Sequence, residues 1–161
     1  MARSKQSNRR AHLHAVILNL EGRYRELMDT TPQIRHDLMP VPKIPAIYVL
    51  SESDKPVYVG RTRNLNDRLA SHMNAANGRN SASFAFRIAK KSAKRAGIDL
   101  PRFGKDIEAL PAFQPRFVKA KRRVAKMGVR YLEVRDPIEQ TLLEVYVAES
   151  LATRYNDFDT H

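Results

Sequence analysis

Residues 46–50 read Ala-Ile-Tyr-Val-Leu, and residues 57–60 read Val-Tyr-Val-Gly, with a short polar segment between them. Apolar and aromatic runs of this length are typical of strands, and the polar segment 51–55 is short enough for a tight turn. The two runs therefore predict a β-hairpin. Because residue 60 is a glycine followed by charged and polar residues, we expect the second strand to end there.

A helix is expected directly after the hairpin. Asn64 stands as its N-cap, with Asp67 three residues later at the spacing of a capping box, and apolar residues then recur at helical spacing. Arg68 and His72 are four residues apart, so their side chains share one face of this helix. The hairpin and the helix together carry two tyrosines, an arginine and a histidine on adjacent elements.

The N-terminal part of the chain predicts a helical element that precedes the hairpin. Apolar residues recur every three or four positions over 11–28, which is typical of an amphipathic helix. Thr31-Pro32 predicts a short second helix that ends at Leu38, and residues 1–10 are basic enough to be expected as a disordered tail. We expect residues 1–40 to form this tail and helical element, and residues 41–161 to form the main domain.

The C-terminal part predicts a basic helical region, a third strand and a final helix. Residues 81–96 and 111–127 have helical periodicity, and residues 129–134 alternate as a strand. Asp136 followed by proline predicts the start of the last helix, which is the most apolar in the chain. The expected fold class is α+β, with a small three-stranded antiparallel sheet flanked by helices and a basic helical insert over about 77–128.

Charge is the strongest global feature of the sequence. Lys and Arg number 29 against 17 Asp and Glu, for a net charge of +12, and the pI is near 10.3. Most of this excess lies in residues 87–126, where 13 basic residues face three acidic ones. A domain this basic has the charge distribution of a nucleic-acid binder. The absence of cysteine excludes disulfides and thiolate chemistry, and the lack of a long apolar stretch predicts no membrane span and a cytoplasmic protein.

Breaking a phosphodiester bond requires an activated water, neutralisation of the charge on the phosphoryl oxygens, and stabilisation of the leaving oxygen. In small nucleases, an arginine and a divalent metal held by a carboxylate often neutralise the charge on the phosphoryl oxygens. Arg68 suits the first role. Glu144 suits the second, because a carboxylate in the middle of the most apolar helix is costly to bury unless it is paired or bound to a metal. Spacing alone does not show that these residues converge.

Three segments resemble the motifs of the GIY-YIG nuclease superfamily. The first is Ala46-Ile47-Tyr48 with Tyr58-Val59-Gly60, and the second runs from Gly60 through Asn64-Leu65 and Arg68-Leu69 to His72. The third is Glu144 on the last helix, followed about three turns later by Tyr155-Asn156. The resemblance covers roughly residues 44–74 and 129–156. It departs from the family pattern at Ala46, which replaces a glycine, at Arg61, where lysine is frequent, and in the length of the basic insert.

The resemblance implies a metal-dependent endonuclease whose catalytic residues are Tyr48, Tyr58, Arg68, His72 and Glu144. Glu144 would hold one divalent ion, Mg²⁺ or Mn²⁺. Arg68 would bind the scissile phosphate, and Tyr48 would act as general base or orient the attacking water. Structural support of the site is expected from Gly60, Asn64 and Asn156. The products would carry 5′-phosphate and 3′-hydroxyl ends.

DNA is the expected partner, with RNA second. Residues expected to contact nucleic acid are Arg61, Arg63, Lys90, Lys91, Lys94, Arg95, Lys119, Lys121, Arg122 and Arg123. The alternative function is a non-catalytic or regulatory nucleic-acid-binding module, although every residue of the expected site is present. The apolar stripe of the N-terminal helix fits either packing on the core or a homodimer.

Overall fold

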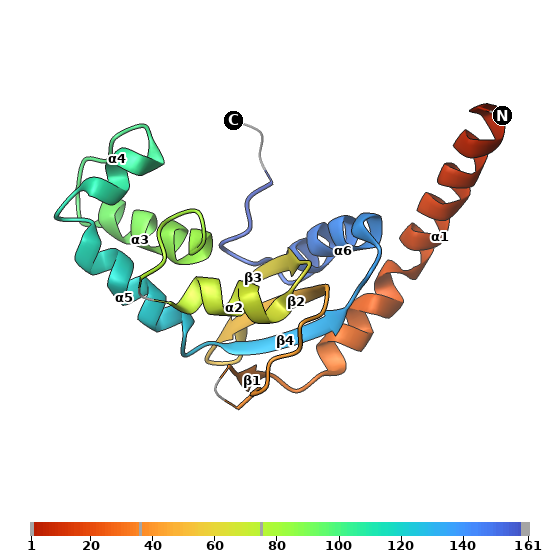
Figure 1. Cartoon of the computed structure of the whole chain (residues 1–161), viewed down its shortest axis with the longest axis horizontal. Helices are drawn as coiled ribbons and strands as arrows, with labels where there is room; N and C mark the ends of the chain where they lie inside the picture. Colours follow the sequence, from red (N-terminus) through yellow and green to blue (C-terminus); the bar gives the residue numbers. More distant parts are fainter. Residues whose placement is uncertain (1, 36, 75, 159–161) are drawn as a thin grey trace.

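The computed structural model describes residues 2–35, 37–74 and 76–158 (Figure 1). The helices are α1 (Ala2–Asp29), α2 (Leu65–Met73), α3 (Ser83–Arg95), α4 (Gly104–Ala109), α5 (Gln114–Val124) and α6 (Pro137–Ser150). The strands are β1 (Gln33–Ile34), β2 (Ala46–Glu52), β3 (Lys55–Thr62) and β4 (Gly128–Glu133). The α+β class and the antiparallel sheet flanked by helices are confirmed.

The sheet has four strands in the order β1-β4-β2-β3, and every neighbouring pair is antiparallel. Three strands were predicted, and the short strand β1 is the additional fourth. Gln33 pairs with Val129 and Ile34 with Gly128, so residues predicted to continue a second helix instead run along the open edge of β4. Pairing at this edge satisfies backbone groups that a short isolated helix would leave unpaired at both of its ends.

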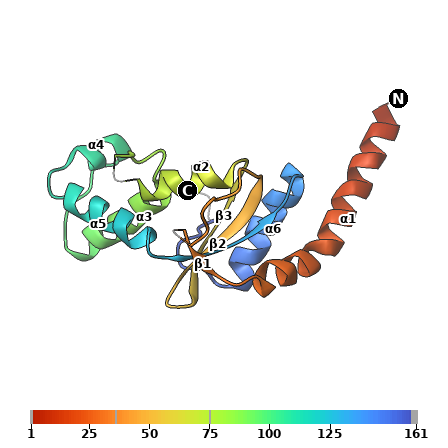
Figure 2. The ribbon, with the colours of Figure 1, turned by 60° about the horizontal axis from the view of Figure 1, so that its bottom comes forward.

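The two faces of the sheet are covered by different sets of helices (Figures 1 and 2). On one face, Ile47 and Val49 of β2 pack in a cluster with α6 and the C-terminal half of α1. On the other face, Tyr48 and Leu50 pack in a cluster with α2, α3 and α5. Because successive strand residues point to opposite faces, the tyrosine of β2 is directed toward the helices that carry Arg68 and the basic residues.

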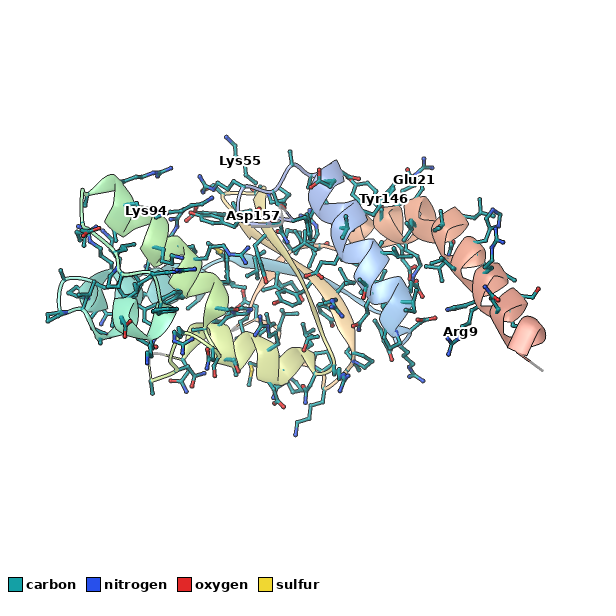
Figure 3. The ribbon with its side chains drawn as sticks, turned by 90° about the horizontal axis from the view of Figure 1, so that it is seen from above. Arg9, Glu21, Lys55, Lys94, Tyr146 and Asp157 are labelled. Carbon is teal, nitrogen blue, oxygen red and sulfur yellow. The ribbon has the colours of Figure 1, made fainter. Side chains whose placement is uncertain are left out.

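Helix α1 begins at Ala2, so the prediction of a disordered tail over residues 1–10 was wrong for the residues that the structure describes. Its C-terminal half packs on α6 and β4, where Leu27 is fully buried. Figure 3 labels Tyr146 of α6 beside Glu21, whose carboxylate accepts its hydroxyl hydrogen bond at 2.6 Å. The N-terminal half of α1 projects away from the rest of the protein (Figure 1). It extends a helix whose other half is already packed, and extending a formed helix is easier than starting a new one.

The basic insert forms a helical lobe at one end of the sheet (Figure 1). Both long helices predicted there exist as α3 and α5, with shorter bounds than expected, and the segment predicted as a connection contains the additional helix α4. Phe86, Phe113 and Phe117 form the contact between α3 and α5, with ring centroids 5.1 to 5.8 Å apart. Among the described residues, no helix is long and apolar enough to cross a membrane.

Both predicted helix caps are confirmed. The Asn64 side chain accepts the backbone N–H of Asp67 at 3.2 Å, and the Asp136 side chain accepts that of Ile138 at 2.7 Å. These bonds satisfy N–H groups that have no partner inside the helix. The first cap fixes the start of α2, and therefore the positions of Arg68 and His72.

Replacing Leu27 with alanine should lower the free energy of unfolding by about 2–5 kcal/mol, because a fully buried leucine leaves a cavity when it is truncated. The matched control is Leu18→Ala on the same helix, which is 72% exposed and should change stability by less than about 0.5 kcal/mol. Urea unfolding followed by circular dichroism measures both. Equal effects of the two variants would contradict the packing of α1 on the sheet.

Candidate active site

Tyr48 lies at the centre of the site and is fully buried. In the β2–β3 ladder it stands directly opposite Gly60. A Cβ atom on residue 60 would lie 2.4 Å from both the ring carbon Cζ and the hydroxyl oxygen of Tyr48. The tyrosine ring therefore lies across the backbone of Gly60, and a side chain at position 60 would displace it. This contact gives the glycine its role in supporting the site.

The Tyr48 hydroxyl is hydrogen-bonded to both functional residues of α2. Its oxygen lies 2.8 Å from His72 Nε2 and accepts the Arg68 Nε hydrogen bond at 3.3 Å. A second guanidinium nitrogen, Arg68 Nη2, donates to Ser83 Oγ at 3.2 Å. Arg68 is thus half buried between β2 and α3, although an arginine on a helix face is usually solvated. The hairpin and α2 bring together the residues predicted from their spacing.

The tautomer of His72 can be assigned from its hydrogen bonds. His72 is fully buried, and its Nδ1 atom has no partner among the described residues. Buried N–H groups without an acceptor are rarer than buried acceptors without a donor, which favours the tautomer with the proton on Nε2. The Tyr48 oxygen then accepts two hydrogen bonds, from Arg68 and from His72, and both bonds favour the phenolate over the phenol.

Burial dominates the acid–base behaviour of the site. Desolvation raises the pKa of Tyr48 well above its usual value, and neighbouring Tyr58 raises it further, while Arg68 opposes the shift. Desolvation, together with the charge of Arg68, lowers the pKa of His72 to about 3. In the protein without substrate, Tyr48 is therefore a phenol and His72 a neutral imidazole at physiological pH.

Tyr58 lies beside this hydrogen-bonded group. Its ring stacks on Phe84 of α3 with centroids 4.3 Å apart and meets His72 edge-on at 6.1 Å. The Tyr48 ring centroid is 6.2 Å from that of Tyr58. Tyr58 is 9% exposed, so it reaches the border between the core and the surface where a substrate would bind. Phe84 supports Tyr58 from the basic insert.

Glu144 projects from α6 at the edge of β3. Its Oε2 atom accepts a hydrogen bond from Arg61 Nε at 3.0 Å, and its side chain is 21% exposed. Desolvation raises the pKa of Glu144, while the nearby charges of Arg61, Arg68 and Arg87 oppose this rise. The carboxylate therefore belongs to the same electrostatic environment as Arg68.

The donor set fits a divalent cation held by one carboxylate. Glu144 Oε1 accepts no hydrogen bond from the described residues, and the described residues contain no group of three acidic or histidine side chains. Mg²⁺ commonly binds through one or two carboxylates and keeps several waters. A cation at Glu144 would compete with Arg61 for the carboxylate, and the exposed Arg61 side chain has room to move away.

Asn156 joins the C-terminal segment to the edge strand β3. Its side-chain amide accepts the N–H of Val59 at 2.8 Å and donates to the Val59 carbonyl at 2.9 Å. Thr153 Oγ1 donates to the same Asn156 oxygen at 2.9 Å. The amide thus replaces a missing neighbouring strand next to Tyr58 and Gly60, which is the supporting position predicted for it.

The ten predicted nucleic-acid contacts do not form one surface. Lys90, Lys91 and Lys94 line a hollow between α3 and the C-terminal segment, and Lys91, Arg95, Lys119 and Arg123 line a second hollow between α3 and α5. Arg63 and Arg122 are exposed, and Arg61 pairs with Glu144. Arg123 is bound to Glu52 by two hydrogen bonds of 2.6 and 2.5 Å.

Lys121 does not present its charge to solvent. The side chain is buried, and its Nζ atom lies 4.1 Å from the centroid of the Phe117 ring. Desolvation lowers the pKa of Lys121, and Glu108 partly opposes this effect. Its position in the α3–α5 lobe supports packing rather than contact with a phosphate.

Two residues near the site were not predicted from the sequence. Ser83 holds the Arg68 guanidinium, and Arg87 carries one of the three charges that act on Glu144. Arg87 could have been found from its spacing, because it precedes Lys91 by four residues and Lys94 by seven on one face of α3. Ser83 gave no comparable signal, since its role depends on how α3 packs against α2.

The sequence profile of the GIY-YIG catalytic domain matches residues 44–98, which hold the hairpin, α2 and α3. Residues 44–98 are thus similar to the catalytic domain of GIY-YIG nucleases. Two crystal structures of the GIY-YIG N-terminal endonuclease domain of UvrC from Thermotoga maritima are also similar, at 17% and 18% identity and a TM-score of 0.43 each. The similarity covers 80% of this chain and 99% of that domain. Both structures are tyrosine-to-phenylalanine mutants bound to a catalytic divalent cation, and no curated protein matches the chain.

Replacing Gly60 with alanine should destabilise the fold by about 1–3 kcal/mol and disturb the Tyr48 ring, because the new methyl group would overlap that ring. Gly22→Ala is the matched control. It lies within helix α1, where its Cβ would meet only the Asn19 side-chain oxygen at 3.2 Å, and alanine favours the helix by about 1 kcal/mol. Urea unfolding compares the two, and near-UV circular dichroism follows the tyrosines. A neutral Gly60→Ala variant would refute the close contact.

His72 should make the folded protein sensitive to acid. Its pKa is about 3 when folded and about 6.5 when unfolded, so between these values only the unfolded chain binds the proton. Stability should therefore fall as the pH decreases from about 6.5 toward 3, by up to about 1.4 kcal/mol per pH unit from this group. We expect His72→Gln to flatten the dependence between about pH 4 and pH 6, and His14→Gln, at an exposed position, to leave it unchanged. Equal slopes in all three proteins, measured by urea unfolding, would contradict the buried neutral histidine.

Proposed function

We propose that the protein is a metal-dependent endonuclease that hydrolyses phosphodiester bonds of DNA. The observation that carries the proposal is the hydrogen-bonded group of Arg68, Tyr48 and His72 beside the half-buried carboxylate Glu144. A buried phenol with two donors directed at its oxygen is costly to assemble for stability alone, since each polar group must lose its water. The GIY-YIG domain match supports the same assignment.

Arg68 has the geometry of a phosphate ligand held in advance of binding. Tyr48 and Ser83 engage its Nε and Nη2 atoms, so the guanidinium plane is fixed, and Tyr58 also interacts with the guanidinium. A fixed cation stabilises charge that develops on phosphoryl oxygens without reorganising during the reaction. We assign Arg68 to the scissile phosphate, with Tyr58 at the edge of the same site.

Tyr48 is assigned to the attacking water. As a phenol, Tyr48 can orient a water molecule by hydrogen bonding. It can accept a proton from that water only after it has lost its own hydroxyl proton. Passing that proton to His72 would form a buried imidazolium, which a pKa of about 3 makes unfavourable by roughly 5 kcal/mol at neutral pH. His72 therefore serves as a donor that positions Tyr48 and stabilises its phenolate, rather than as a base.

Glu144 is assigned as the protein ligand of one divalent cation, Mg²⁺ or Mn²⁺. Such a cation would supply positive charge to the phosphoryl and leaving oxygens. The protein's part is to hold the carboxylate ionised. Arg61, Arg68 and Arg87 favour the ionised form, because their charges oppose burial, which raises the pKa of Glu144. Asn156 keeps β3, which carries Arg61, fixed against the C-terminal segment.

The net charge of +12 and the basic hollows on α3 support a nucleic-acid substrate. DNA is the proposed substrate, and cytoplasmic association with nucleic acid is the proposed setting. A non-catalytic binding module would keep the basic surface but would have no use for the buried Tyr48 group. Cleavage therefore separates the two functions directly.

The nuclease assignment predicts nicking or linearisation of supercoiled plasmid that requires Mg²⁺ or Mn²⁺ and stops with EDTA. Glu144→Gln and Arg68→Ala should each reduce the rate by about a hundredfold or more, because each removes charge stabilisation at the reacting phosphate. Glu149→Gln is the matched control, since this exposed glutamate lies on the same helix and should retain full activity. Thermal unfolding of every variant reports whether the fold persists. Salt-sensitive binding without cleavage by the parent protein, on plasmid or on a single-stranded circle, would favour the binding module.

A further inference from the structure

A basic hollow lies next to the proposed active site. It encloses about 410 Å³ between α3 and the C-terminal segment and is lined by Arg87, Lys90, Lys91, Lys94, Arg154 and Tyr155. Figure 3 labels Lys94 on α3 and Asp157 on the C-terminal segment, and Asp157 also lines the hollow. Five cations thus face a single carboxylate in one concave surface.

Three of these cations hold the hollow together. Arg87 Nη1 donates to the carbonyl oxygen of Tyr155, and Lys91 Nζ donates to that of Arg154 at 2.7 Å. Lys91 also lies 4.7 Å, and Arg154 5.1 Å, from the centroid of the Tyr155 ring. These contacts fasten the C-terminal segment to α3 and cover the one aromatic ring of the hollow, so a nucleobase has no open face to stack on.

Lys90 and Lys94 have no such task. Among the described residues, the hydrogen bonds from α3 to the backbone of the C-terminal segment come from Arg87 and Lys91, while Lys90 and Lys94 stand four residues apart on α3 and line the hollow. Like charges at this spacing repel each other and weaken a helix. An anion between or above them would offset this repulsion. A phosphodiester backbone, which carries one charge per nucleotide, supplies such an anion.

The hollow is related to the active site through Arg87. Arg87 lines it and is also one of the three arginines whose charge acts on Glu144. Three aromatic rings extend from the active site to the hollow. The Tyr58 ring stacks on Phe84 with centroids 4.3 Å apart, and Phe84 meets Tyr155 edge-on at 5.4 Å. Lys90 and Lys94 follow Arg87 by three and seven residues on α3, so the three cations extend from the surroundings of Glu144 into the hollow.

We propose that this hollow is a subsite for the sugar–phosphate backbone that flanks the cleaved bond, with Lys90 and Lys94 as its phosphate ligands and Arg87 as its link to the active site. The inference deepens the proposed function and rests on it. Because the Tyr155 ring is covered, the subsite recognises charge and not base identity. The second hollow, about 290 Å³, shares Lys91 with the first and extends the basic surface toward Lys119 on α5.

The subsite is tested by binding without cleavage. Fluorescence anisotropy in EDTA would compare a labelled duplex with a labelled single strand of the same sequence, across a series of salt concentrations. We expect Lys90→Gln/Lys94→Gln to weaken binding about tenfold or more and to reduce the salt slope by about two, because two phosphate contacts are lost. The matched control, Lys105→Gln/Lys126→Gln, removes the same charge from exposed positions outside both hollows.

A variant that binds more tightly than the parent protein gives a result that a folding defect cannot produce. The Asp157 carboxylate repels a phosphate in the hollow, so Asp157→Asn should tighten binding severalfold. Weaker binding by the lysine variant together with tighter binding by the Asp157 variant would support the subsite, and the nucleic-acid form that shows the larger changes is its ligand. Lysine and control variants with equal affinity and equal salt slopes would overturn it.

The same variants separate this proposal from the nuclease assignment. Glu144→Gln should bind with undiminished affinity while cutting nothing. If the parent protein also cuts nothing, but its binding depends on Lys90, Lys94 and Asp157 as described, the subsite stands and the nuclease proposal fails. If the parent protein cuts in a Glu144-dependent manner and the lysine variant binds as the control does, the nuclease proposal stands and the subsite fails.

Discussion

The contact between the Tyr48 ring and the backbone of Gly60 is the constraint on which the rest of the site depends. Tyr48 on β2 pairs with Gly60 on β3, so its ring can lie across the backbone of β3. This contact fixes the position of the Tyr48 hydroxyl group above the sheet. Arg68 and His72 reach that hydroxyl only because the Asn64 cap fixes where α2 begins. The two interactions are local in sequence, yet together they set the position of a cation, an imidazole and a phenol.

Burial gives these groups their chemical character. The same desolvation that keeps His72 neutral and Tyr48 protonated also raises the pKa of Glu144, and three arginines oppose that last effect. The site therefore holds excess positive charge around a single carboxylate. Such an arrangement is suited to an anion, and the proposed substrate, a phosphodiester, is one. Binding of substrate and ordering of the site are thus expected to be linked.

Local pattern predicted most of the fold and much of the site. The hairpin, the two helix caps and the shared face of Arg68 and His72 follow from spacings of fewer than 20 residues, where sequence and geometry are closely tied. The errors arose where distant contacts decide. Gln33–Ile34 forms a strand because the edge of β4 is open about a hundred residues later, and Lys121 is buried because α5 packs on α3. Ser83 was missed because no periodicity relates it to Tyr48 or Glu144.

The protection of the sheet edges affects how the protein behaves at high local concentration. At one edge, the strand β1 is only two residues long. At the other, β3 contains Pro56, and side-chain amides occupy its outward groups: Asn156 at Val59 and Gln140 at the Thr62 carbonyl. A polycation gathers in many copies along a nucleic acid, where open strand edges would pair between molecules. The short strand β1 and these side-chain amides reduce the number of backbone groups that are available for such pairing.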